Sequence, residues 1–227
     1  MLPLRDTLKL TGTPAVTRAL VVTNVVVFLA QLSSGKLGEV WVTIFGFVPL
    51  RLFEPSRFGY APWEGVLTLF TSIFFHGGMV HLLGNMVYLW IFGDDVEELM
   101  GRWQFAVFYL ACGAFGSLTH AFLYPASTIP SIGASGSIAG ILGAFLVFHA
   151  RAKIVALLPL VVPVLAEVPS ALFLPVWFAM QFLNGFLSLS SARDVQEVAS
   201  VAWWAHVGGF LFGIGIAGIV RGLRTED

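Results

Sequence analysis

The sequence IGASGSIAGILGAF, at residues 132–145, is uncharged and places a serine among glycines and apolar side chains. Runs of small residues are frequent in membrane helices, where Gly136, Gly140 and Gly143 would let two backbones approach closely. The stretch therefore predicts a membrane helix over Ser135–Ala150 that packs tightly against a neighbouring helix.

The composition of the whole chain indicates that lipid is its main solvent. Of 227 residues, 57% are hydrophobic and 11% are charged, whereas soluble domains have roughly 45–50% apolar and about 25% charged residues. The chain has 21 Phe and 7 Trp but only 13 acidic and 12 basic side chains, too few to coat a water-facing surface. The sequence therefore predicts an integral membrane protein whose surroundings are the lipid bilayer.

Charge and cysteine content exclude several other classes. The formal net charge is −1 and the basic residues are scattered, so no basic stripe favours nucleic acid as a partner. Cys112 is the single cysteine, which rules out an intrachain disulfide and any multi-cysteine zinc or iron–sulfur site. The motif HExxH of zinc proteases is missing as well. We expect no cofactor and no metal.

Six segments are apolar enough to cross a bilayer, which needs about 20 mostly apolar residues and fewer where protein covers the ends. Their approximate ranges are 16–32, 80–92, 103–123, 135–150, 170–189 and 201–220. We therefore predict an all-α, polytopic membrane protein that forms one domain over residues 1–227. The second and fourth segments are short, so we expect each to begin inside the protein, where a cavity could admit water.

Residues 33–79 form a long loop after the first segment. Its longest apolar run, Val40–Leu50, carries Pro49 and is too short to cross the bilayer, so we expect the loop to lie at the membrane interface. The run Val155–Ala166 contains two prolines and is likewise expected to be a connection.

The distribution of basic residues orients the bundle. With six spans both termini lie on one side, and the positive-inside rule identifies that side as cytoplasmic. The basic residues on the terminal side are Arg5, Lys9, Arg18, Arg102, Arg151, Lys153, Arg221 and Arg224, against Lys36, Arg51, Arg57 and Arg193 opposite. The N-terminal ends of the second, fourth and sixth spans then face the extracytoplasmic side.

Polar side chains inside membrane spans are functional candidates by default. They are His81, Asn85, His120, Ser135, Ser137, Gln181, Asn184 and His206. In the sequence HLLGN, His81 and Asn85 are four residues apart and share one helix face. An interhelical hydrogen bond would explain this pair equally well.

Ser135 and His206 favour nucleophilic chemistry when they are taken together. Ser135 stands at the junction of an uncharged loop and a helix, where free backbone N–H groups can stabilise an oxyanion. His206, in WWAHVGGFLFG at residues 203–213, precedes a series of glycines that would let its helix approach the serine helix. Close packing alone would explain the glycines, but not a histidine at the same predicted depth as an open serine. We therefore predict a Ser–His dyad without an orienting carboxylate.

These motifs resemble those of the bacterial rhomboid intramembrane serine proteases. The resemblance covers the six-helix core and rests on HLLGNMVYLWIFGDDVEELMG, IGASGSIAGILGA and AHVGGFLFG. It implies that Ser135 is the nucleophile and His206 the general base. It further implies that His81, Asn85 and the Ser135 N–H stabilise the oxyanion, with Gly133 as structural support.

The resemblance also implies a setting for the reaction. The chain would be a serine endopeptidase of the bacterial inner membrane, and its substrates would be transmembrane segments of other proteins. Two positions depart from the family pattern: Glu64 follows Trp63 where many members have arginine, and Ala139 stands where some members have an aromatic residue against the histidine. The orientation of His206 must then come from other packing.

Two other functions remain open on the sequence. One is a catalytically inactive rhomboid-like protein that binds transmembrane clients, against which the intact polar residues argue. The other is a small transporter or channel, which would more often place charged residues near the midplane or show an inverted repeat.

Overall fold

A computed structural model describes residues 1–8, 12–158, 163–190 and 202–224 of the chain. The described elements of the first half are β1 Leu2–Asp6, α1 Ala15–Ser33, α2 Lys36–Phe45, α3 Pro49–Phe53, η1 Pro55–Phe58, α4 Pro62–Thr71, η2 Ser72–Phe74 and α5 Met79–Met100. Those of the second half are α6 Arg102–Leu123, α7 Ser135–Phe148, β2 Lys153–Leu158, β3 Val164–Pro169, α8 Ser170–Ser190 and α10 Trp203–Arg224.

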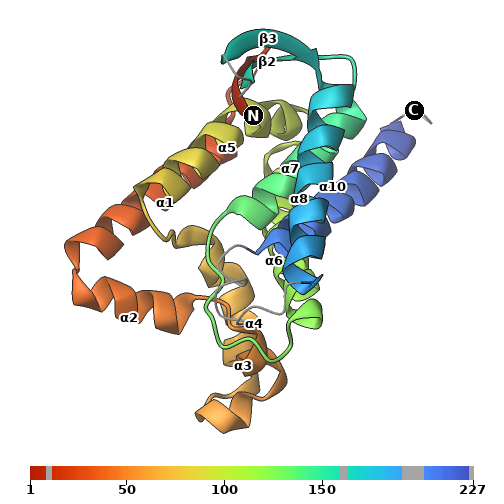
Figure 1. The fold of residues 1–227 in the computed structure, drawn as a ribbon. Helices are drawn as coiled ribbons and strands as arrows, with labels where there is room; N and C mark the ends of the chain where they lie inside the picture. The colour runs from red at the N-terminus through yellow and green to blue at the C-terminus, as the bar shows by residue number, and fades with distance from the viewer. Residues whose placement is uncertain (9–11, 159–162, 191–201, 225–227) are drawn as a thin grey trace.

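The long helices form a polytopic membrane bundle (Figure 1). By length and composition, α1, α6, α8 and α10 can each cross a bilayer. The segment Pro62–Phe74, which joins α4 and η2, passes the same test together with α5, and the two are bent by 83° from one another. Helix α7 is apolar but has only 14 residues. The exact number of six spans stays a prediction.

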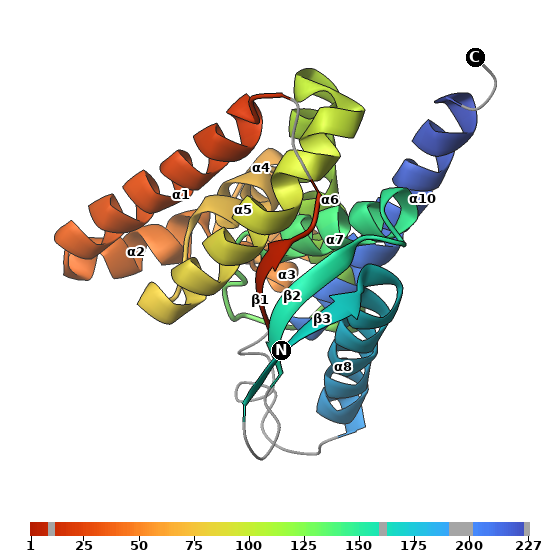
Figure 2. The same ribbon diagram turned by 90° about the horizontal axis from the view of Figure 1, so that it is seen from above.

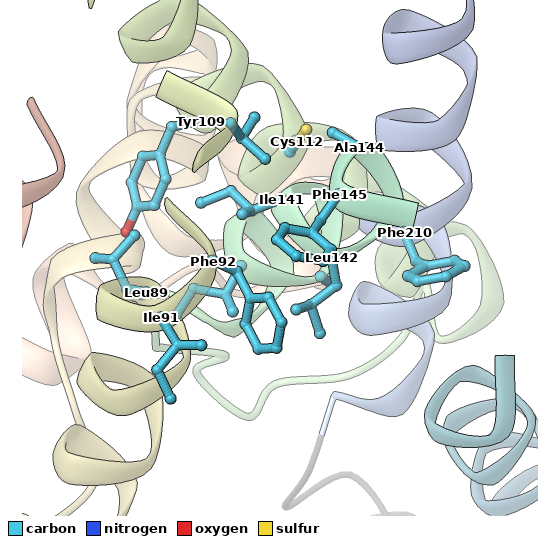
Figure 3. Packing of buried hydrophobic residues seen from close by; sticks show 14 of the residues in the cluster. Leu89, Ile91, Phe92, Tyr109, Cys112, Ile141, Leu142, Ala144, Phe145 and Phe210 are labelled. Atoms are coloured by element: carbon cyan, nitrogen blue, oxygen red, sulfur yellow. The ribbon is translucent and has the colours of Figure 1, made fainter. Parts of the chain in front are cut away.

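The core lies where α5, α6, α7 and α10 meet. Figure 3 shows side chains from these four helices converging on one another. Phe92 of α5 packs edge-on against Phe145 of α7, with ring centroids 5.0 Å apart. Helix α7 is buried along most of its length, so it occupies the centre of the bundle.

Glycines set the distance between α7 and α10. A Cβ atom added to Gly209 would overlap the carbonyl oxygen of Gly136, and one added to Gly213 would overlap that of Gly140. The two backbones are therefore in direct contact, as small residues permit in membrane helices. The contact fixes the register between the helix that carries Ser135 and the helix that carries His206.

A small sheet is an addition to the expected all-helical fold. Strand β2 pairs antiparallel with β1 on one side and with β3 on the other. Apart from Pro163, the described residues of the run Val155–Ala166 thus belong to β2 and β3, in the connection between α7 and α8. Figures 1 and 2 show the sheet at the end of the bundle where the chain begins.

Several helix boundaries differ from the expected spans. Helix α5 continues to Met100, past the expected end at Phe92, and α10 continues to Arg224. The extra turns of α5 contain carboxylates, at which an apolar-run criterion stops. One of these, Glu97, is buried and accepts hydrogen bonds from the backbone N–H groups of Val16 and Thr17 at 3.0 and 2.7 Å. It thereby caps the start of α1.

The long loop between α1 and α5 contains short helices. In Figure 1, α2 runs across the direction of α8 and α10, and α3 and α4 lie at the opposite end of the bundle from the sheet. Glu64, which stands where arginine was expected, accepts a hydrogen bond from the Ala61 N–H at 2.6 Å and so caps α4.

Candidate active site

Ser135 is the first residue of α7, and the loop before it is fixed to the α1–α5 connection. Ser131 and Phe47 exchange backbone hydrogen bonds of 2.7 and 3.0 Å, and the Gly133 N–H donates to the Ser72 carbonyl at 3.0 Å. These bonds hold the chain immediately before the serine. Because Ser135 begins the helix, its N–H has no carbonyl one turn earlier in α7 to bind.

Gly133 is required at its position for two reasons. Its φ angle is +121°, which L side chains rarely adopt. A Cβ atom there would also lie 2.8 Å from Cε1 and Nε2 of the His81 ring. The glycine therefore lets the loop pass directly against His81.

His206 stands in the first turns of α10 and reaches the serine. Its Nε2 atom lies 2.8 Å from Ser135 Oγ, within hydrogen-bond distance. Its Nδ1 atom lies 2.8 Å from Oε1 of Gln181 on α8. The indole of Trp177 and that of Trp203 flank the imidazole, with ring centroids 6.2 and 6.0 Å away.

His81 and Asn85 approach the same place from α5. The Gly77 N–H donates to His81 Nδ1 at 3.3 Å, so the neutral ring carries its proton on Nε2, the atom beside Gly133. One N–H of the Asn85 amide donates to the His81 carbonyl at 3.0 Å. An amide has two such protons, so the second is available to another acceptor.

These residues line one cavity of about 590 Å³. Its lining includes His81, Asn85, Gly133, Ser135, Trp177, Gln181 and His206. None of the described residues that line it is Asp, Glu, Lys or Arg. The site thus joins a hydroxyl, an imidazole and several hydrogen-bond donors without a fixed charge.

Three other polar residues noted in the spans lie outside this cavity lining. Ser137 is fully buried and its hydroxyl lies against Gly113. His120 is buried on α6, and Asn184 is half-buried on α8. Within the described ranges, no cluster of three or more His, Cys, Asp or Glu residues is arranged to hold a metal ion.

The contact between Gln181 and His206 was missed by reasoning from the sequence. Gln181 was recognised only as a polar residue in an apolar helix. The amide of Gln181 was the available signal, because a buried amide in a membrane helix needs a partner. Its partner depends on the rotation of α8 about its own axis, which the sequence does not reveal.

Fold and site together define a polytopic helical membrane protein with a Ser–His pair in an internal cavity. The chain belongs to the rhomboid family, because the Rhomboid domain matches residues 63–222, more than half of its length. The match begins at the second residue of α4 and ends in α10, so it contains every residue of the cavity lining.

Individual relatives share between a quarter and two fifths of their matched residues with the chain. Rhomboid protease GluP of Bacillus subtilis (strain 168) is 34% identical over 136 residues, which are 60% of this chain and 25% of that protein. RHOMBOID-like protein 6, mitochondrial, of Arabidopsis thaliana is 30% identical over 155 residues, covering 57% of this chain and 50% of that protein. The chain thus spans no more than half the length of these relatives.

One relative that matches is named as an inactive protein. Inactive rhomboid protein 1 of Drosophila melanogaster is 33% identical over 78 residues, covering 34% of this chain and 5% of that protein. Membership of the family therefore leaves the activity of this chain to be argued from its own site.

Proposed function

We propose that this chain is an intramembrane serine endopeptidase that cleaves transmembrane segments of other proteins through a Ser–His dyad. The observation that carries the proposal is the 2.8 Å contact between Ser135 Oγ and His206 Nε2 in a cavity that also receives His81 and Asn85. A nucleophile, a base and oxyanion donors around one space fit the requirements of acyl transfer.

The reaction begins when a substrate segment unwinds locally beside the bundle. A helix hides its carbonyl groups, and unwinding in lipid leaves them without partners, so small or helix-breaking residues near the cut favour cleavage. Ser135 Oγ then attacks the carbonyl carbon while His206 Nε2 takes the hydroxyl proton. The carbonyl oxygen becomes an oxyanion.

The donors around the cavity stabilise this oxyanion. Nε2–H of His81, the second N–H of Asn85 and the Ser135 backbone N–H are the groups assigned to it. Collapse of the tetrahedral species breaks the C–N bond, and His206 returns its proton to the leaving amine. An acyl-enzyme remains on Ser135.

Water completes the cycle. It attacks the acyl carbon while His206 takes one of its protons, and that proton returns to Ser135 Oγ as the carboxylic acid leaves. The cavity beside the short helix α7 is the route we assign to this water.

The proposed location is the plasma membrane of a bacterium, with both termini in the cytoplasm. The excess of basic residues at the terminal side supports this orientation. Fusion of a cytoplasm-active reporter to either end tests it, because both fusions should be active.

The function is tested by cleavage of a single-span substrate in proteoliposomes. Wild type should cut, whereas Ser135→Ala and His206→Ala should lose at least about 10⁴-fold in rate. Ser137→Ala is the matched control, since this neighbouring serine lies outside the cavity lining. Reaction with a fluorophosphonate probe should follow the same pattern.

Other outcomes would identify the rival functions. A folded wild type that neither cuts nor reacts with the probe contradicts the protease and favours an inactive, client-binding protein. Equal cutting by all variants would show that the dyad assignment is wrong.

The oxyanion assignment has a test of its own. Asn85→Ala should lower the rate of cleavage by about 10²–10³, because one donor to the oxyanion is lost. The Michaelis constant should change little, since the donor acts on the transition state. A change confined to the Michaelis constant would contradict this role.

A further inference from the structure

His206 uses both of its ring nitrogens in the described structure. Nε2 contacts Ser135 Oγ and Nδ1 contacts Gln181 Oε1, each at 2.8 Å. A neutral imidazole carries one proton, so one nitrogen donates and the other accepts. Which of the two donates decides whether Nε2 can take the serine proton.

The amide nitrogen of Gln181 shows which ring nitrogen of His206 carries the proton. Its Nε2 atom donates to the Trp177 carbonyl at 3.4 Å, one turn earlier in α8. The amide oxygen therefore faces His206, and an amide oxygen can only accept. Nδ1 of His206 must then hold the proton, which leaves the lone pair of Nε2 directed at the Ser135 hydroxyl.

We propose that Gln181 is a positioning residue for the general base: its amide oxygen binds Nδ1–H of His206 and so presents the Nε2 lone pair to Ser135. This inference rests on the proposed protease function and names the group that orients its base. Trp177 and Trp203 flank the ring without such a bond to Nδ1 in the described structure, so they restrict its plane but do not select its tautomer.

A neutral amide suits this position better than a carboxylate. The described residues that line the cavity bring no charge to it, and Gln181 is buried. A buried carboxylate would carry a large desolvation penalty in a membrane protein. The amide supplies the hydrogen bond that selects the tautomer without that penalty.

The test compares Gln181→Leu and Gln181→Glu with wild type. Leucine has a similar size but no acceptor, so kcat for a transmembrane substrate and the rate constant for fluorophosphonate labelling should both fall about ten- to a hundredfold. The Michaelis constant should stay within about twofold, because a positioning residue acts through His206. Asn184→Leu, on the same helix but outside the cavity lining, is the matched control and should react like wild type.

The glutamate variant separates positioning from mere packing. Its carboxylate can accept from Nδ1–H, so activity should recover relative to Gln181→Leu. A carboxylate also favours the protonated imidazole, so the acid limb of the pH–activity profile should move to higher pH by about one unit or more. Among the described residues, His81 of α5 and His120 of α6 are the other ionisable side chains whose charges interact with that of His206, and both are unchanged in every variant.

A measurement on the resting protein does not depend on turnover. The ¹⁵N chemical shifts of the His206 ring report its tautomer, and Nδ1–H should dominate in wild type and in Asn184→Leu but not in Gln181→Leu. Equal tautomers, equal rates and equal pH profiles in wild type and Gln181→Leu would overturn the inference while the protease stands. An inert wild type overturns the protease function, and the tautomer then still decides whether Gln181 orients His206.

Discussion

Two of the contacts that helix α10 makes differ in kind. Against α7 it packs backbone to backbone, at Gly209 on Gly136 and at Gly213 on Gly140. Against α8 it packs through aromatic side chains, with Phe178 stacked on Phe210 at 4.8 Å between centroids. The dyad spans the first contact, whereas the amide of Gln181 reaches His206 across the second.

The two contacts tolerate displacement differently. Lipid tails are as apolar as leucine, so apolar side chains gain little from leaving lipid, and membrane helices are held together by close van der Waals packing and interhelical hydrogen bonds. A backbone contact has no flexible atoms that can adjust, whereas stacked rings can slide or rotate. In the most apolar part of α8, 22% of the residues are buried, compared with 50% in α6. Nucleophile and base thus lie on the rigid contact, and the residue that orients the base lies on the adaptable one.

The largest effect is expected when a methyl group is placed in the rigid contact between α7 and α10. Gly209→Ala should lower the free energy of unfolding by about 1–3 kcal/mol, because the new Cβ overlaps the Gly136 carbonyl. It should also slow cleavage by roughly a hundredfold, since a displacement near 1 Å is enough to misalign His206 and Ser135.

Gly215→Ala is the control on the same helix, because a Cβ there meets nothing within 4 Å. It should keep its activity and gain up to about 1 kcal/mol in stability from helix propensity. Thermal unfolding in detergent and cleavage in proteoliposomes measure both effects. Equal behaviour of the two variants would show that the α7–α10 distance does not control the site.

A smaller effect is expected when the adaptable contact is weakened. Phe178→Ala removes the ring stacked on Phe210, and such aromatic pairs contribute about 0.5–1.5 kcal/mol. Fluorophosphonate labelling should slow only severalfold, because Gln181 shifts relative to His206 while Ser135 and His206 keep their positions relative to one another. Phe186→Ala, on the exposed face of the same helix, is the control. A hundredfold loss in Phe178→Ala would mean that α8, too, is a rigid part of the site.

The sequence predicted those parts of the site that depend on local spacing and depth. Ser135 follows a glycine loop, His206 precedes a glycine series, and His81 and Asn85 share a helix face, so their proximity required only that the helices pack at one depth. The structure brings these four residues to one cavity. Their catalytic roles stay predictions until the variants are measured.

The parts that the sequence did not yield depend on long-range pairing or on rotation of a helix. Strand β1 pairs with β2, whose residues lie about 150 positions later in the chain, as in the pair Leu2 and Leu157. An apolar-run criterion does not detect such pairing. The partner of Gln181 depends on which face α8 turns toward α10. The length of α5 was underestimated because the apolar run ends at Phe92, before Gly93, Asp94 and Asp95, whereas the helix continues through these residues to Met100.

Glu97 attaches α1 to α5 by a polar cap, which is a third kind of contact. Its loss is expected to have the smallest effect on catalysis. Its carboxylate accepts from the backbone N–H groups of Val16 and Thr17 and from the Thr17 hydroxyl at 2.8 Å. Glu97→Gln keeps the shape but replaces one accepting oxygen with a donor, so α1 should lose about 0.5–2 kcal/mol of stabilisation. Cleavage below the unfolding temperature should be unchanged, because α1 contributes no residue to the cavity lining.

Glu39→Gln on the exposed face of α2 is the control and should alter neither property. If Glu97→Gln slowed cleavage below the unfolding temperature, α1 would have to be counted with α7 and α10 among the elements that hold the dyad. The distinction between a rigid catalytic pair and the helices attached to it would then fail.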